Sequence, residues 1–185
     1  MRAGVLGFGM GINKRDDTLM RGLVRYTART LESERPVPFG ALIVHSTTGD
    51  VLMRGLNAVA GENDPSAHAE LRTVRKATKR LARVAATRML TGYTMYTTCE
   101  PCPMCMANAL WAGLDRVVYG ATIEDAARHC RQIYVPAKEV AERSDMECVV
   151  DGPVLREECY ALFTHPNMQR VFATWGTGSR RLVKA

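Results

Sequence analysis

The sequence predicts an α/β fold: a three-layer α/β/α sandwich around a central mixed sheet of five strands. Apolar runs with strand character alternate along the chain with segments of helical period. This alternation is typical of a sheet that helices cover on both faces. The 185 residues suit one domain, and 46% hydrophobic and 24% charged residues are the composition of a globular protein rather than a disordered one.

The first third of the chain predicts a helix followed by a β-hairpin. Asp16 and Asp17 suit the positive end of a helix dipole, and apolar residues keep a helical period from there to about Ser33. Pro36 and Pro38 exclude any further helix. We expect strands at 39–45 and 51–55 with a turn at 47–50 between them, and a polar loop at 57–66.

The remainder of the chain predicts alternating helices and strands. Pro103 suits the first turn of a helix, where its missing N–H leaves no hydrogen bond unmade. Residues 133–140 fit neither pattern, and the pattern from Pro166 onward is weak. We therefore expect helices at 67–86, 103–111, 124–128 and 153–165, and strands at 93–98, 116–120 and 146–150.

The chain is expected to contain one folded domain with two flanking segments. Residues 1–14 predict an N-terminal extension, 15–165 the domain, and 166–185 a C-terminal tail, docked or mobile, that could cap the active site. The apolar runs fall short of the roughly 20 residues that span a bilayer. Residues 1–11 lack the apolar core of a signal peptide. We expect a cytoplasmic protein without membrane contact.

Two short motifs predict a metal site. His68-Ala69-Glu70 precedes Cys102 and Cys105 by just over thirty residues, and each motif falls where a loop enters a predicted helix. One imidazole and two thiolates suit Zn²⁺, and three protein ligands leave a fourth position open for water, as in catalytic sites. A carboxylate two residues after the imidazole lies near the zinc without having to bind it, so Glu70 can carry protons.

Other interpretations of these residues stay open. Cys102 and Cys105 also fit a structural zinc site, with Cys99 as the fourth ligand that closes it, or a redox pair. Glu70 also fits an exposed first-turn residue that the helix dipole favours. Cys130, Cys148 and Cys159 are expected to be buried and to act as small apolar residues of the core.

The two motifs, with their flanks, resemble a known family. Residues 63–70 read NDPSAHAE and residues 98–105 read TCEPCPMC. Both are similar to the cytidine-deaminase-like superfamily of zinc-dependent nucleobase deaminases. They are closest to the branch that holds guanine deaminases and tRNA adenosine deaminases. Residues 38–41 and Asn57 also fit this branch, and the resemblance covers about 18–164.

This resemblance implies a role for each matching residue. Family members bind zinc through one histidine and two cysteines, use the glutamate to move protons, and often form homodimers. Other positions would contact the base, Asn57 by a hydrogen bond and the aromatic residues as walls of the pocket. The implied set is His68, Cys102 and Cys105 for zinc, Glu70 for catalysis, and Asn57, Phe39, Ala69 and Trp111 for substrate binding.

The reaction that the resemblance implies is hydrolysis of an exocyclic amine to a carbonyl, with release of ammonia. Our leading hypothesis is a deaminase of a free aminated base, nucleoside or related heterocycle, with a guanine-like base as the best single candidate. Residues 127–132 lack the carboxylates that bacterial guanine deaminases tend to carry there. This difference favours an anionic or acceptor-rich heterocycle.

Two alternatives differ in class from this hypothesis. The first is a tRNA-specific adenosine deaminase, which would flip out its target base and bind the surrounding phosphates. The second is a non-catalytic interaction domain that zinc stabilises. The formal charge of +6 and a basic stripe at helical spacing favour RNA, although such a stripe also fits a solvated helix face; it comprises Arg72, Arg75, Lys76, Lys79, Arg80 and Arg83.

Overall fold

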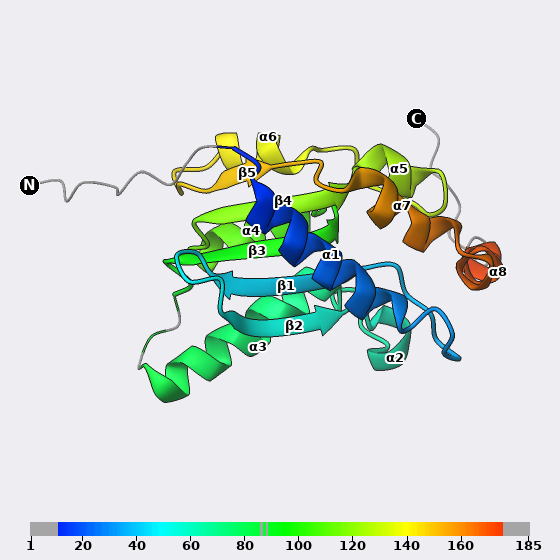
Figure 1. The fold of residues 1–185 in the computed structure, drawn as a ribbon, viewed down its shortest axis with the longest axis horizontal. Helices are drawn as coiled ribbons and strands as arrows, with labels where there is room; N and C mark the ends of the chain where they lie inside the picture. Colours follow the sequence, from blue (N-terminus) through cyan, green and yellow to red (C-terminus); the bar gives the residue numbers. More distant parts are fainter. Residues whose placement is uncertain (1–10, 86, 88, 176–185) are drawn as a thin grey trace, which may run out of the picture.

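The computed structural model describes residues 11–85, 87 and 89–175, and it has three layers. A five-stranded sheet forms the middle layer in the order β2-β1-β3-β4-β5 (Figure 1). The β1 strand pairs antiparallel with β2 and β3, while β3–β4 and β4–β5 are parallel. The predicted mixed sheet is therefore confirmed. Its strands are β1 (Gly40–His45), β2 (Val51–Leu56), β3 (Tyr93–Cys99), β4 (Arg116–Ala121) and β5 (Val149–Asp151).

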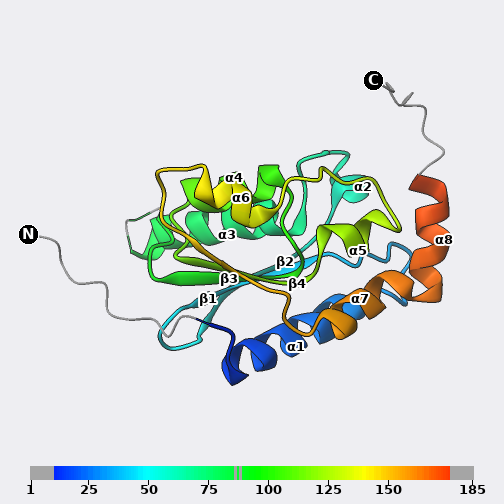
Figure 2. The ribbon, with the colours of Figure 1, turned by 90° about the horizontal axis from the view of Figure 1, so that it is seen from above.

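Helices cover both faces of this sheet. Figure 2 shows α1 (Lys14–Ala28) and α7 (Arg156–Thr164) on one face, with α3 (Ala69–Val84), α4 (Pro103–Trp111) and α6 (Ala137–Glu142) on the other. Each face has its own apolar core. Leu23 and Phe163 are fully buried on the α1 side, and Ala77 and Met106 are fully buried on the α3 side. Burial of these two apolar surfaces stabilises the sandwich.

Glycines in two neighbouring strands allow helices to approach the sheet closely. A Cβ at Gly55 would lie 2.1 Å from the Thr73 Oγ1 atom of α3. A Cβ at Gly40 would lie 2.1 Å from the Thr27 Oγ1 atom of α1, on the opposite face. Any larger residue would push these helices outward. The Gly55 contact matters for function, because α3 begins directly after His68.

The first helix differs in its ends from the prediction. It begins at Lys14 because Asn13 forms a capping box with Asp16: each side chain bonds the backbone N–H of the other residue. It ends at Ala28 rather than near Ser33. Just after this end, the Thr30 hydroxyl donates to the carbonyl of Val37 and accepts from the N–H of Val37. These side-chain bonds replace the helical pattern with a turn.

Two expectations for the connecting segments need correction, and one ambiguous segment is assigned. The expected loop at 57–66 contains a short helix, α2 (Val59–Glu62), and the ambiguous segment 133–140 contains the start of α6. The strand expected at 146–150 is displaced to Val149–Asp151, because the Ser144 hydroxyl bonds both the N–H and the carbonyl of Met146 and holds it in a turn. The remaining short helix, α5 (Ile123–Ala127), lies close to its expected place.

The C-terminal region contains two helices instead of one helix and a weak pattern. The helix expected at 153–165 is shorter, as α7, and α8 (Pro166–Trp175) follows it directly. Met168 and Phe172 of α8 are buried, so this part of the tail is docked. Figure 1 shows α8 at the end of the molecule where β3 and β4 terminate. The predicted division at 1–14 and 166–185 stays a prediction, and residues 1–10 and 176–185 lie outside those described.

The helices of the described part are too short or too polar to cross a bilayer.

Candidate metal and catalytic site

Two helix N-termini meet where strands of the sheet end. His68 is the N-cap residue of α3 and Cys102 is the N-cap residue of α4, with Pro103 in the first turn that follows. The segment before His68 is held in place because the Ala58 N–H, just past β2, donates to the carbonyl of Ala67 over 2.9 Å. The start of α3 is thus tied to the end of β2.

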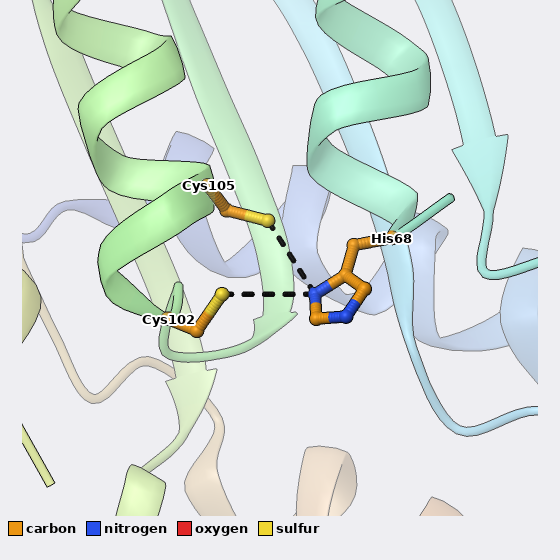
Figure 3. A group of neighbouring side chains, drawn as sticks. All are labelled: His68, Cys102 and Cys105. Carbon is orange, nitrogen blue, oxygen red and sulfur yellow. Dashed lines mark hydrogen bonds between the residues drawn. The ribbon is translucent and has the colours of Figure 1, made fainter. Parts of the chain in front are cut away.

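The three predicted zinc ligands lie together at this junction (Figure 3). The Sγ atoms of Cys102 and Cys105 each lie 3.6 Å from Nδ1 of His68, and the ligand atoms are within 4.8 Å of one another. Zn–S bonds of about 2.3 Å and Zn–N bonds of about 2.05 Å at tetrahedral angles give an S···N separation of about 3.6 Å. The donor set therefore fits zinc without rearrangement.

Cys99 does not belong to this group. Among the described residues, the cluster that could hold a metal consists of His68, Cys102 and Cys105 alone. The Cys99 thiol is buried and points toward the carbonyl of Thr122, 3.8 Å away. Its burial raises the pKa of the Cys99 thiol well above its usual range, which disfavours the thiolate that zinc requires. The arrangement therefore has the open fourth position of a catalytic zinc site.

The local electrostatics favour a thiolate at Cys102. A hydrogen bond from Cys105, and then one from His68, lower the pKa of the Cys102 thiol to about 4. The same hydrogen bond to Cys102, together with burial, raises the pKa of Cys105. The hydrogen bond to Cys102 also raises the pKa of His68. A thiolate held between an imidazole and a second thiol is prepared for a divalent cation.

Glu70 lies beside the ligands without being one of them. Its side chain is only 5% exposed, which argues against the solvated first-turn role. Burial, and then the negative charge of Cys102, raise the pKa of the Glu70 carboxyl to about 7. A carboxyl group with a pKa near neutrality can both accept and donate a proton in one reaction cycle.

The structure brings two predicted substrate residues close to the ligands. Asn57 directly follows β2, and its neighbour Ala58 is bonded to the segment that carries His68. Ala69 is the first residue of α3, where helical N–H groups have no intrahelical partner. The side chain of Asn57 is half-buried at this edge. Contact of both residues with a substrate stays a prediction.

The two predicted aromatic residues differ in their surroundings. Phe39 immediately precedes β1, and its carbonyl accepts a hydrogen bond from the Asn57 N–H. Its ring packs edge-on against the Phe163 ring, with centroids 5.2 Å apart. Trp111 is 75% exposed at the far end of α4, about 13 Å along the helix from Cys102. The role of both rings in walling the pocket stays a prediction.

Glu100 is a residue whose importance the sequence did not reveal. It lies between Cys99 and Cys102, its side chain is buried, and its carboxylate accepts two hydrogen bonds. One comes from the Ile123 N–H at the start of α5, over 3.3 Å, and the other from the Ala137 N–H at the start of α6, over 2.9 Å. The loop before Cys102 is thereby tied to two helix N-termini, which favour a negative charge.

Glu100→Gln is expected to weaken zinc binding about 10- to 100-fold, the usual cost of losing a residue that orients metal ligands. The amide nitrogen of glutamine cannot accept from a backbone N–H, so one of the two helix links is lost. A competition titration with a chromophoric chelator measures the zinc affinity.

Asp16→Asn is the matched control for this prediction. Asp16 is also a buried carboxylate, and it accepts from the Asn13 N–H over 2.9 Å on the opposite face of the sheet. Both variants are expected to unfold at lower temperature than the parent, but only Glu100→Gln is expected to bind zinc more weakly. Equal zinc affinity in the two variants would show that Glu100 supports the fold alone.

Comparison with protein families gives a match at this site. Residues 13–121 match the family described as the cytidine and deoxycytidylate deaminase zinc-binding region. The matched segment spans α1 to β4 and includes both metal motifs. It covers more than half of the chain, and it ends before α5.

Individual proteins are similar to the same region. Guanine deaminase of Bacillus subtilis is 44% identical over 90 residues, which cover 49% of this chain and 54% of that protein. The match thus spans about half the length of that relative. The tRNA-specific adenosine deaminase of Bacillus subtilis is 32% identical over 78% of this chain and 83% of its own length. The solved guanine deaminase of Nitrosomonas europaea shares the fold, with a TM-score of 0.69 and 17% identity over 90% of this chain and 99% of that chain.

Proposed function

Because this chain belongs to the cytidine and deoxycytidylate deaminase zinc-binding family, we propose that it is a zinc-dependent hydrolytic deaminase. Its substrate is an aminated base, nucleoside or related heterocycle, and a guanine-like base is the leading candidate. One observation carries this proposal: the buried carboxyl group of Glu70 lies beside a three-ligand metal group that lacks a fourth protein ligand among the described residues. A zinc site that only stabilises an interaction domain needs no buried acid at that place.

We assign each residue of the site a separate role in the reaction. Zinc, when bound by His68, Cys102 and Cys105, lowers the pKa of an attached water toward neutrality. Glu70 would take one proton from the attacking water and pass it to a ring nitrogen, and would then carry the second proton of that water to the departing amine. One C–O bond forms and the exocyclic C–N bond breaks, so that water and the amine become a carbonyl and ammonia. Asn57 is expected to hydrogen-bond the base.

The choice of base rests on the relatives and on the segment after α5. A guanine deaminase is 44% identical over the region that holds both motifs. The segment after α5, in contrast, is basic: Arg128 lies over the Tyr160 ring at 5.7 Å, and His129 hydrogen-bonds Tyr160 and Gln169. The Arg128 guanidinium has no acceptor atom, and both ring nitrogens of His129 already have partners, so neither residue replaces a carboxylate as acceptor for the N–H groups of guanine. An acceptor-rich heterocycle suits this environment better than guanine itself.

The proposal is tested by measuring ammonia release from a panel of bases. Guanine, isocytosine, pterins, triazines, cytosine and adenosine present the amine on rings that differ in their donors and acceptors. Turnover of at least one free heterocycle by the zinc-loaded protein is expected. A zinc-loaded, folded protein that releases no ammonia from any of them, or from RNA, would contradict the deaminase proposal.

A second candidate is the deamination of adenosine in tRNA. The similarity to the tRNA-specific adenosine deaminase extends over 83% of that protein, a wider match than the guanine deaminase gives. The formal charge of +6 also favours a polyanionic substrate. Inosine formation in a tRNA transcript, without turnover of free bases, would establish this candidate in place of the first. A homodimer is expected for either activity.

A further inference from the structure

A groove lined by basic residues lies between the edge strand β2 and the second half of α3. It has a volume of about 400 Å³. Its apolar walls are Met53 of β2 and Val84 of α3, and the Val84 side chain is 73% exposed. The side chains that give the groove its charge all come from one face of α3. They are Lys76, Lys79, Arg80 and Arg83, and we call the groove that they line the basic groove.

The basic groove continues a seam that begins at the metal site. At the site end, Arg72 donates to the carbonyl of Leu56, the last residue of β2. Farther along, Arg80 donates to the carbonyl of Leu52 over 3.4 Å. These two bonds show that β2 and α3 run in opposite directions along the seam. The groove therefore leads away from Asn57 toward the C-terminal end of α3.

The four cations of the basic groove have no counterions within the described part of the chain. Other arginines on the same structure are paired: Arg72 with Glu62 and Arg21 with Glu158. None of the groove cations has a carboxylate within ion-pair distance among the described residues, and no carboxylate lines the groove. Lys76 with Arg80, and Lys79 with Arg83, place like charges four residues apart, which destabilises a helix. A polyanion in the groove would relieve this repulsion.

We propose that the basic groove binds the phosphate backbone of an RNA. Lys76 and Arg83 are seven residues apart, about 10 Å along the helix, so the row of cations is long enough to contact successive phosphates of one strand. Lys76 is eight residues from His68, or about 12 Å, so phosphates next to a base in the site can reach the groove. The choice of RNA as the ligand rests on the second candidate function, the deamination of adenosine in tRNA. The phosphate contact itself is argued from the charge and position of the groove residues.

The test is binding of a fluorescently labelled RNA stem-loop to the full chain, measured by anisotropy between about 50 and 200 mM salt. The variant replaces all four groove cations by glutamine: Lys76→Gln, Lys79→Gln, Arg80→Gln and Arg83→Gln. We expect it to bind RNA at least roughly 10-fold more weakly, and the slope of log affinity against log salt to fall in magnitude by about 3 to 4, because four phosphate contacts are lost.

A matched control removes four exposed cations from α1 and its C-cap, on the face of the sheet opposite α3 (Figure 2): Lys14→Gln, Arg21→Gln, Arg25→Gln and Arg29→Gln. Both variants change the net charge from +6 to +2, so a general effect of charge would weaken them equally. Equal weakening would overturn the proposal, as would a parent protein that binds anionic phosphatidylserine vesicles but not the stem-loop.

Activity on free bases separates this inference from the proposed function. The groove residues lie outside the site, so the groove variant is expected to release ammonia from any free base as fast as the parent. Loss of RNA binding with unchanged turnover would support both proposals. RNA binding through the groove in a parent that deaminates neither bases nor RNA would support the groove while the deaminase proposal fails.

Discussion

Glu70→Gln is expected to slow ammonia release by at least about 10²-fold while the protein keeps its zinc and its fold, the range for loss of a proton-transfer group. Glutamine has nearly the same shape as glutamate but cannot take a proton from water. Its side chain also carries no charge to bury, so the fold is not expected to be weakened at the position where Glu70 is 5% exposed. Steady-state kinetics and zinc content of the same preparation measure both effects.

The matched control is Glu142→Gln, on the exposed end of α6. It makes the same chemical change far from the metal ligands, and its activity is expected to equal that of the parent. If Glu70→Gln releases ammonia at the parent rate with zinc in place, another group must move the protons, and the mechanism proposed for this site is wrong.

His68→Ala is expected to lose the metal. It removes the one ligand that α3 supplies and leaves Cys102 and Cys105, both from a single helix turn. Two ligands do not hold zinc against dialysis as three do, and both sulfurs then face a cavity where the imidazole lay. Elemental analysis is expected to find about one zinc per chain in the parent and nearly none in the variant.

Thermal unfolding gives a second measure of the same loss. Added zinc stabilises a protein that binds it in the folded state, by about 4 kcal/mol at a thousand times its dissociation constant. The parent is expected to unfold at higher temperature with zinc, and His68→Ala is not. His45→Ala is the control, because it makes the same substitution outside the metal ligands. His45 is the last residue of β1, at the opposite end of that strand from Gly40. Equal zinc stabilisation of all three proteins would place the metal elsewhere.

Much of the fold could be predicted from the sequence because its elements carry local signals. The helical period of Val74, Ala77 and Leu81 predicts α3, and Pro103 predicts the start of α4. Errors arose where a side chain bonds the backbone locally. Thr30 ends α1 early, and Ser144 shortens β5, through hydrogen bonds that no periodicity records.

Residue types and spacing were sufficient to single out His68, Cys102, Cys105 and Glu70. Which of their neighbours take part depends on the packing of the fold. Cys99 is three residues from Cys102, yet its thiol turns into the core, and Glu100 reaches helices that begin 23 and 37 residues later. Burial and direction depend on packing between distant segments, and a linear pattern of residues does not contain that information.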